Sequence, residues 1–313
     1  MTKFPKPIQL PKKVLHSRRE RNLQILQAAR NGILIRFFIV LFELAGVYLF
    51  SSSALFLDAL ASSLDIVASL FLIICIKLAA RPPDRDHPFG HGRYEPLAGL
   101  QLGLLLIVTG VGMAMQQTMQ LKEVPEGIFM DPRAWIIPAI ATLFLELCYQ
   151  FTMRAAKKEH STALAADAMH YRVDALTSLL AAVALIAAIF FPRWSIFIDH
   201  LGAIFIAFLM IGIGVAAFRQ NLSQVMDRIP PSQCFSKVQN AALNVSGVKG
   251  TEKIRIQLYG PDAHVDIDIE VDPRLSVEKA HRISQKVRAE IQETWPAVQD
   301  VTVHIEPYYA NDH

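Results

Sequence analysis

Charge is scarce in this sequence. Asp, Glu, Lys and Arg make up 19% of its 313 residues, whereas 52% of the residues are hydrophobic and the mean hydropathy is +0.31. An average soluble domain has about 25% charged residues. A chain of this length is long enough for two soluble domains, but this composition indicates a membrane protein instead.

Cysteine is rare, and common catalytic motifs are missing. The three cysteines, Cys75, Cys148 and Cys234, are odd in number and scattered, which excludes a disulfide framework. The sequence has no HExxH pattern and no nucleophile elbow. A metal-dependent intramembrane hydrolase needs an activated water and a general base, so we expect no enzyme. The net charge of +3 is better explained by anionic lipid headgroups than by a nucleic acid partner, and we expect none of the latter.

Six apolar runs are long enough to cross a bilayer, which takes about 20 residues as a helix. They cover roughly residues 32–53, 54–80, 96–120, 133–155, 162–191 and 195–219. Lys and Arg are concentrated in residues 1–31 and around the second and fourth loops, and such residues favour the cytoplasmic side. We therefore predict a basic cytoplasmic tail over residues 1–31 and six transmembrane helices over residues 32–222, with both termini cytoplasmic.

The last part of the chain has a different pattern. After about residue 225 the hydropathy falls, and PPSQCFSKVQNAALNV repeats apolar residues at helical spacing. TEKIRIQLYG and AHVDIDIEV alternate apolar with polar residues around a GPD turn, which predicts a β-hairpin. SVEKAHRISQKVRAEIQETW is typical of an amphipathic helix, and DVTVHIEP of a final strand. Residues 223–313 are thus predicted to form a cytoplasmic α-β-β-α-β domain of ferredoxin-like α+β type.

Two pairs of aspartates interrupt the apolar runs at the same spacing. LDALASSLDIVASL contains Asp58 and Asp65, and ADAMHYRVDALTSLL contains Asp167, His170 and Asp174. Offsets of three, four and seven return to one helical face, and ionisable residues within a bilayer usually serve transport or proton relay. A histidine and an aspartate at i and i+4 can hold one cation, and imidazole with carboxylates suits Zn²⁺, Fe²⁺ or Mn²⁺. The alternative is that these residues only form hydrogen bonds between helices or at helix ends.

Other polar residues leave two interpretations open. Asp84, His87 and His91 gather in the loop RPPDRDHPFGHGRYE, which is either a metal cluster or a polar turn rich in Pro and Gly. Glu43 and Glu146 stand alone in their apolar runs. They are either structural acids kept protonated by burial or proton-relay groups.

Together these features resemble the cation diffusion facilitator family of metal transporters. The resemblance covers about residues 30–307, and LDALASSLDIVASL, HPFGHGRYEPLAGL and ADAMHYRVDALTS carry it. It implies a homodimer in a lipid bilayer that exports a divalent cation by alternating access in exchange for protons. The metal is then a transported substrate and possible regulator, and no resident cofactor is expected.

The resemblance also implies roles for individual residues. Asp65, His170 and Asp174 match three of the four ligands of the family's transport site. The fourth position falls at Ala61, so water, Asp58 or an acid of a neighbouring helix would have to complete the metal shell.

Further metal sites are implied outside the transport site. The three loop residues Asp84, His87 and His91 match a secondary site of some members, and Arg93 and Asp227 match a charge pair seen in similar proteins. The residues that match a metal pair in the cytoplasmic domain of some members are Glu252, His281, His304 and Glu306. Glu252 stands where one member has histidine, and the helix near Cys234 has no histidine, so the sequence departs from a full binuclear cluster at these two points.

The sequence therefore predicts a metal/proton antiporter of a bacterial cytoplasmic membrane, with Zn²⁺ as the first substrate and Fe²⁺ or Mn²⁺ next. The rival hypothesis is a transport-inactive metal sensor or scaffold of the same family. In that case the missing ligand at Ala61 has ended transport. A flux measurement in proteoliposomes separates the two.

Overall fold

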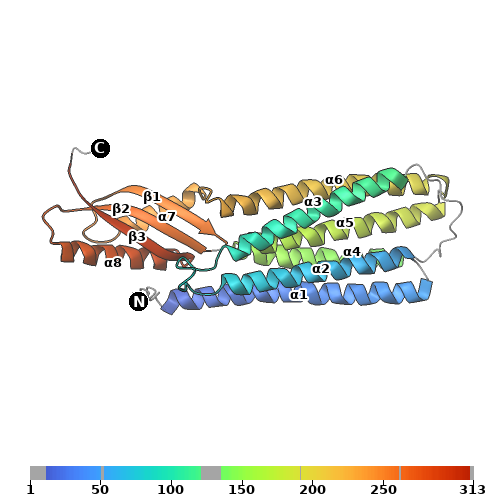
Figure 1. Ribbon diagram of the computed structural model, residues 1–313, viewed down its shortest axis with the longest axis horizontal. Coiled ribbons are helices and arrows are strands. Elements are labelled where there is room, and N and C mark those ends of the chain that lie inside the picture. Colours follow the sequence, from blue (N-terminus) through green and yellow to red (C-terminus); the bar gives the residue numbers. More distant parts are fainter. Residues whose placement is uncertain (1–11, 51–52, 121–134, 191, 261, 311–313) are drawn as a thin grey trace. The chain divides into compact units, whose positions relative to one another are not determined.

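The computed structural model describes residues 12–50, 53–120, 135–190, 192–260 and 262–310 (Figure 1). Six long helices come first along the chain: α1 (Lys12–Phe50), α2 (Ser53–Ala79), α3 (Tyr94–Gln120), α4 (Ile136–Lys158), α5 (Thr162–Phe190) and α6 (Pro192–Val225). A small α+β domain follows, with α7 (Ser232–Leu243), β1 (Gly250–Tyr259), β2 (Asp262–Val271), α8 (Val277–Thr294) and β3 (Val298–Pro307).

The chain divides into two compact units. One consists of residues 24–79 and 94–222, and the other of residues 1–23, 80–93 and 223–313. The first unit is helical and contains the motifs of the second and fifth apolar runs. The second unit contains the α+β domain together with the loop before α3.

The helical unit agrees with the expected membrane spans. A long helix lies at each of the six predicted positions. Within the described residues, four stretches are long and apolar enough to cross a membrane: Val14–Gly46, Tyr94–Met119, Ile136–Lys158 and Leu201–Val225. The protein is therefore a multi-pass membrane protein, while the full count of six spans stays a prediction.

Helix α1 begins earlier than the first apolar run. It is helical from Lys12, within the stretch predicted to be a basic tail. In the unit that holds the α+β domain, Arg18 donates from Nε to the Pro296 carbonyl oxygen at 3.1 Å and from Nη2 to the Ala297 carbonyl oxygen at 3.0 Å. Arg21 donates to Asp262 at 3.0 Å. Basic residues at this end of the chain thus bind specific oxygens of the α+β domain.

A tight turn fixes where α5 begins. His160 has a φ of 53°, and Ser161 follows as the residue before the first helical turn. The Ser161 hydroxyl accepts a hydrogen bond from the Leu164 N–H at 3.2 Å, which satisfies a donor that the helix itself leaves unpaired. The same hydroxyl donates to the buried carboxyl of Glu95 on α3. Ser161 thus caps α5 and joins its start to α3.

Helices α3 and α6 approach each other through glycines. A Cβ atom on Gly103 would lie 2.7 Å from the backbone nitrogen of Phe218, and one on Gly214 would lie 2.9 Å from the carbonyl oxygen of Gly103. Small residues at membrane helix interfaces allow this close backbone approach. A side chain at either position would push the two helices apart.

We expect Gly103→Ala to destabilise the protein by about 1–3 kcal/mol, the usual cost of overpacking. The obstacle is backbone, which cannot move aside without shifting α6. Gly112→Ala on the same helix is the matched control, because a Cβ there meets nothing within 4 Å. The melting temperatures of both variants in detergent test this interface, and equal melting temperatures would contradict it.

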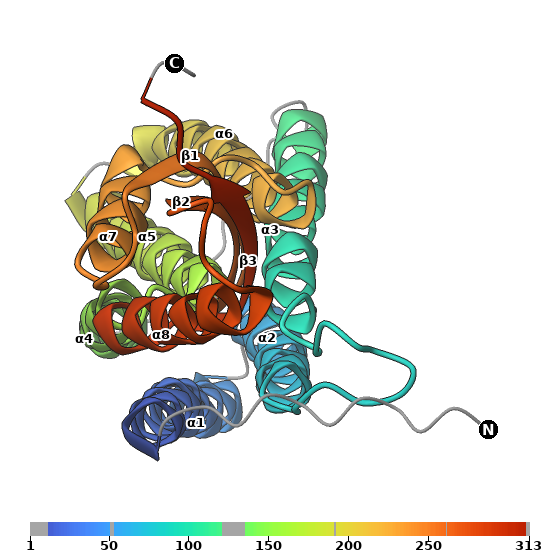
Figure 2. The same ribbon diagram turned by 90° about the vertical axis from the view of Figure 1, so that its left-hand side faces the viewer.

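The α+β domain has the predicted order of elements. The sheet order is β1-β2-β3, with β1 and β2 antiparallel and β2 and β3 parallel. Helices α7 and α8 cover one face of the sheet (Figure 2). Val265, Ile267 and Ile269 of β2 are completely buried there and pack with Val287 and Ile291 of α8. The period-two alternation of β2 therefore places its apolar residues in this core and its acidic residues on the other face.

Candidate metal sites

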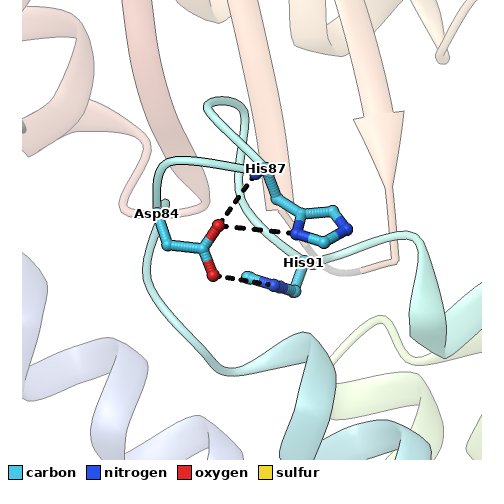
Figure 3. Close-up of side chains that lie close together, drawn as sticks. All are labelled: Asp84, His87 and His91. Carbon is cyan, nitrogen blue, oxygen red and sulfur yellow. Dashed lines mark hydrogen bonds and ion pairs between the residues drawn. The ribbon is translucent and has the colours of Figure 1, made fainter. Parts of the chain in front are cut away.

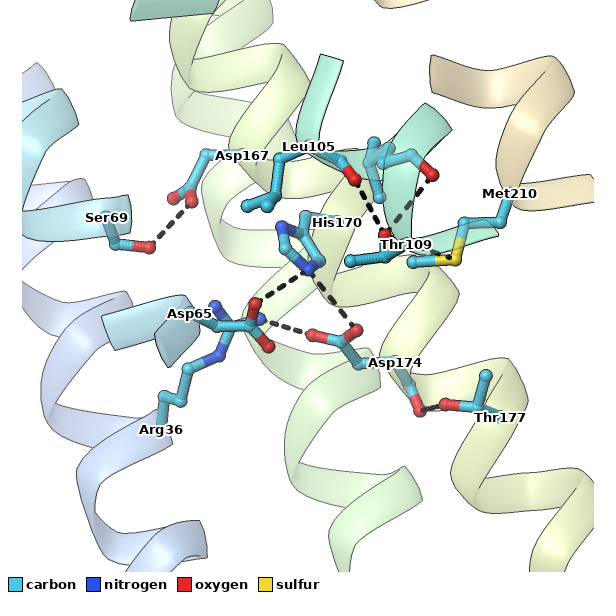
Figure 4. Close-up of polar contacts among 11 residues, drawn as sticks. Arg36, Asp65, Ser69, Leu105, Thr109, Asp167, His170, Asp174, Thr177 and Met210 are labelled. Carbon is cyan, nitrogen blue, oxygen red and sulfur yellow. Dashed lines mark hydrogen bonds and ion pairs between the residues drawn. The ribbon is translucent and has the colours of Figure 1, made fainter. Parts of the chain in front are cut away.

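The predicted transport ligands lie together in the helical unit. The His170 Nε2 atom is 3.3 Å from Oδ1 of Asp65 and 3.6 Å from Oδ1 of Asp174 (Figure 4). One potential ligand atom from each of the three side chains lies within 4.8 Å of the others. A nitrogen and two carboxylate oxygens at this separation form a donor set that fits a divalent transition metal.

Two helices position these three ligands. Asp65 lies on α2, whereas His170 and Asp174 lie one turn apart on α5. His170 is 2% exposed, and Asp65 and Asp174 are partly buried. Partial burial strengthens the electrostatic attraction for a bound ion. Because the ligands come from two helices, movement between these helices would change the geometry of the site.

Asp167, the other aspartate of the α5 pair, is not one of these three candidate ligands. Asp167 is completely buried and accepts a hydrogen bond from the Ser69 hydroxyl at 2.9 Å, which joins α5 to α2 one turn from His170 (Figure 4). For Asp167 the structure favours the hydrogen-bonding interpretation. The side chains of Asp58 and Ala61 lie outside the part that the structure describes, although both residues are helical in α2. A role for Asp58 as a fourth ligand stays a prediction.

The sequence reasoning missed Arg36. This residue of α1 is 2% exposed, and its Nη2 atom donates to Oδ2 of Asp174 (Figure 4). Its guanidinium lies over the ring of Tyr171, 4.4 Å from the ring centroid. The signal was present in the sequence as a lone basic residue inside the apolar run ILIRFFIV. Ionisable residues at such positions are functional candidates by default, although no metal-ligand spacing distinguishes this arginine.

Glu43 and Glu146, the lone acids of the first and fourth apolar runs, have different surroundings. Glu146 on α4 accepts hydrogen bonds from Arg172 on α5 and from Gln150 at 3.1 Å. It therefore joins two helices as one half of an ion pair, which favours the structural interpretation. Glu43 is 3% exposed on α1, and its two interpretations stay open.

The loop before α3 forms a second group of potential ligands. Asp84 Oδ1 lies 3.4 Å from Nδ1 of His87, and Asp84 Oδ2 lies 3.4 Å from Nε2 of His91 (Figure 3). The Asp84 carboxylate also accepts backbone hydrogen bonds from His87 at 2.8 Å and Asp86 at 3.0 Å. These bonds, above all the one from His87, hold the pKa of Asp84 below its usual range. The arrangement is at once a compact turn and a possible metal site, so the loop assignment stays a prediction.

The third group lies on the face of the sheet that α7 and α8 do not cover. His304 Nδ1 is 3.7 Å from Asp268 Oδ1 and 3.2 Å from Glu306 Oε1. Asp268 and His304 are partners in the parallel register of β2 and β3, so this contact follows from strand pairing. Glu252 is hydrogen-bonded to Glu306. In the described part of the chain, His281 does not join this group and lies near Gln285 on α8, which separates it from the predicted set.

The hydrogen bond with the Glu252 carboxyl, followed by its own desolvation, raises the pKa of Glu306. A carboxyl with a raised folded-state pKa contributes stability that is present at low pH and lost as the pH rises through that pKa. We therefore expect Glu252→Gln to raise the melting temperature of the metal-free protein near neutral pH and to change it little at acid pH, because glutamine donates a hydrogen bond without adding charge.

The measurement is the melting temperature of both proteins in the presence of a chelator, from about pH 4 to about pH 8, across the range in which carboxyls titrate. Glu293→Gln, on the exposed side of α8, is the control for removing one acid from the domain. If the melting temperature of Glu252→Gln differs from that of the unmodified protein by the same amount at every pH, Glu252 is not coupled to Glu306.

One charge pair expected from the resemblance is present. Arg93 donates from Nη2 to both carboxylate oxygens of Asp227, at 3.0 Å and 3.2 Å. Asp227 has a φ of 54°, a conformation that aspartate tolerates better than most residues. The pair is solvent-exposed, so its contribution to stability is small.

Comparison with known proteins places this geometry in a family. A model of the cation efflux transmembrane domain matches residues 31–226, and a model of the cation efflux protein cytoplasmic domain matches residues 230–308. The chain therefore belongs to the cation efflux family, the cation diffusion facilitators. The expected family, and with it the expected fold class of a membrane helical domain followed by an α+β domain, is confirmed.

Similar proteins include some that are named for metal tolerance or for manganese efflux. Metal tolerance protein C1 of Arabidopsis thaliana is 32% identical over 276 residues, which is 84% of this chain and 58% of that protein. The manganese efflux system protein MneP of Bacillus subtilis (strain 168) is 26% identical over 291 residues, 90% of this chain and 97% of that protein. MneS of the same organism is 30% identical over 264 residues, which is 83% of this chain and 88% of that protein.

Solved structures of MamM C-terminal domain variants are also similar to the cytoplasmic part. One of them is 28% identical and covers 25% of this chain and 95% of that domain, with a TM-score of 0.25.

Proposed function

We propose that this protein exports a divalent metal ion across a bacterial cytoplasmic membrane in exchange for protons, by alternating access, with both termini in the cytoplasm. The observation that carries the proposal is the convergence of Asp65, His170 and Asp174 within 4.8 Å inside the helical unit. Metal ligands must be deprotonated to bind. Protons that arrive at these side chains from one side of the membrane therefore help to release the metal, and their departure on the other side permits its entry.

Zn²⁺ is the first substrate candidate, because it is commonly held by few ligands that include histidine and carboxylate. Mn²⁺ is the second, because the similar B. subtilis proteins are named manganese efflux proteins and carboxylate oxygens suit that ion. Fe²⁺ remains the third candidate. The metal is the transported substrate in each case.

The working unit is proposed to be a homodimer, supported by the match of residues 230–308 to the family's cytoplasmic domain. The metal-ligating groups of the loop and of the cytoplasmic sheet are proposed to be secondary sites. Their donor sets, Asp84 with His87 and His91, and the group around His304, resemble the transport set in chemistry but are more exposed.

The experiment is flux in proteoliposomes that contain a pH-sensitive dye. We expect an inward gradient of Zn²⁺ or Mn²⁺ to drive proton movement in the opposite direction, with a rate that saturates with metal concentration. If metal binds to the purified protein but drives no flux of metal or protons, the sensor or scaffold hypothesis replaces the antiporter. Metal flux without proton flux would leave a metal transporter but exclude the exchange.

A further inference from the structure

A permanently charged residue lies within the candidate transport site. Arg36 is buried in the apolar part of α1, where a guanidinium is costly unless it is paired. Its Nη1 atom has no hydrogen-bond partner among the described residues, whereas its Nη2 atom binds Asp174. Arginine stays protonated in proteins, so this charge is always present.

The surrounding residues hold the guanidinium in place. The ring of Tyr171 lies 4.4 Å from Cζ of Arg36 and makes a cation–π contact. The Tyr171 hydroxyl would lie 2.6 Å from a Cβ atom on Gly32, one turn earlier on α1. A glycine and an arginine four residues apart thus share one face of α1 and bracket a single tyrosine of α5.

The hydrogen bond from Arg36 gives the two carboxylate oxygens of Asp174 different partners. Oδ2 accepts the hydrogen bond from Arg36, while Oδ1 faces Nε2 of His170. Oδ1 of Asp65 faces the same imidazole nitrogen. The metal-facing set is therefore one oxygen from each aspartate and one nitrogen, and the second oxygen of Asp174 is already occupied by the guanidinium (Figure 4).

We propose that Arg36 is a positioning residue of the transport site: it restricts Asp174 to one oxygen for the metal and adds a fixed positive charge that weakens binding of the divalent ion. The inference rests on the proposed function of Asp65, His170 and Asp174 as metal ligands. With neutral imidazole, the formal charge of the two carboxylates and Arg36 is −1, compared with −2 for the carboxylates alone. The site therefore attracts a divalent ion less strongly and releases it more readily.

A structural role for the same ion pair makes a different prediction. Arg172 provides a matched comparison, because it also pairs with a carboxylate of another helix, Glu146, and lies 4.9 Å from the ring centroid of a tyrosine, Tyr149. If Arg36 only anchored α1 to α5, its loss would resemble the loss of Arg172: lower stability with unchanged metal affinity.

The test uses the full-length protein with Zn²⁺ and Mn²⁺ as probes. Metal dissociation constants are measured in detergent by competition with a chromophoric chelator, and KM and kcat are measured from flux in proteoliposomes. The variants are Arg36→Gln, which removes the charge, Arg36→Lys, which retains it, and Arg172→Gln as the control. Measurements at mildly alkaline pH limit proton competition for the carboxylates.

We expect Arg36→Gln to tighten metal binding by about tenfold or more, because a unit charge a few ångströms from a divalent ion changes its energy by at least that factor even at an effective dielectric constant near 20. KM and kcat should both fall, since tighter binding slows release. Arg36→Lys keeps a cationic group but loses the planar guanidinium on Tyr171, so its dissociation constant should lie between those of the unmodified protein and Arg36→Gln. Arg172→Gln should not change the dissociation constant.

Unchanged or weaker metal binding in Arg36→Gln overturns the inference. If that variant does not fold, Arg36→Met, whose thioether can pack on Tyr171, must show the same tightening. The experiments distinguish a failure of the proposed transport site from a failure of the proposed role of Arg36. If His170→Ala binds and transports metal normally, the proposed site is wrong; if His170→Ala is inactive and Arg36→Gln behaves as the unmodified protein, only the role of Arg36 is wrong.

Discussion

Replacing His170 with alanine should abolish metal-driven proton flux while leaving the protein folded. Its Nε2 atom is the nitrogen ligand among the three described candidate ligands and lies 3.3 Å from Asp65 Oδ1 and 3.6 Å from Asp174 Oδ1. Without it, two carboxylate oxygens remain as protein ligands from this group, too few to complete the usual zinc shell. Loss of a residue that only supports a metal ligand costs about 10- to 100-fold in metal affinity or activity, so loss of a ligand should reduce flux by about 100-fold or more.

Folding should survive this change for a specific reason. The Nδ1 atom of His170 has no hydrogen-bond partner among the described residues, so truncation leaves no buried donor or acceptor orphaned at that atom. Arg36 stays paired with Asp174 and still neutralises one of the two carboxylates. The protein should therefore elute as the same oligomer in size-exclusion chromatography.

The matched control is His16→Ala, which removes an exposed histidine of α1 that pairs with Glu20 one turn away. This variant should retain full flux with unchanged KM. Full flux in His170→Ala vesicles would show that the metal passes elsewhere. Loss of flux in both variants would indicate that the assay responds to a general defect.

The sequence predicted those parts of the candidate site that depend on spacing within one helix. His170 and Asp174 are one turn apart, so helical geometry alone places them together, and the matching aspartate spacing in the second apolar run identified Asp65. Contacts between distant parts of the chain were not predictable in this way. Arg36 and Asp174 are separated by 138 positions, and no local period links them.

In the cytoplasmic domain, too, local patterns were predictable from the sequence, whereas contacts between distant residues were not. Alternation of apolar and polar residues was sufficient to predict the hairpin, the amphipathic helix and the last strand. The choice of metal-ligating partners was not, because it depends on the register between β2 and β3. That register pairs Asp268 with His304, which brings an unpredicted aspartate into the group and leaves the predicted His281 outside it. If the register were shifted by one residue, His304 would lie opposite a different residue of β2.

The arginine also changes how the missing fourth ligand should be understood. A carboxylate at position 61 would add one negative charge to the site, whereas this chain has alanine there and the guanidinium of Arg36 beside Asp174. Both features act in the same direction and weaken the attraction for a divalent ion. Low affinity is compatible with export, because a transport site must also release its ion.

Ala61→Asp should therefore tighten metal binding and slow transport. Residue 61 lies four positions before Asp65 in α2, and residues i and i+4 share a helical face. A third carboxylate there would complete a four-ligand shell and increase the electrostatic attraction for the ion. We expect the dissociation constant for Zn²⁺ to fall by about tenfold or more, equivalent to at least ~1.4 kcal/mol, and kcat to fall because release becomes slower.

Ser63→Asp is the matched control for this change. Ser63 lies two residues from both Ala61 and Asp65, on the opposite side of the same helix, so the added charge is the same and only its direction differs. Metal affinity and flux should be compared for the unmodified protein, Ala61→Asp, Ser63→Asp and Asp58→Ala in the same vesicles. Unchanged affinity in Ala61→Asp would show that position 61 does not face the site. Loss of binding in Asp58→Ala would instead identify Asp58 as the fourth ligand, because its carboxylate is the group removed.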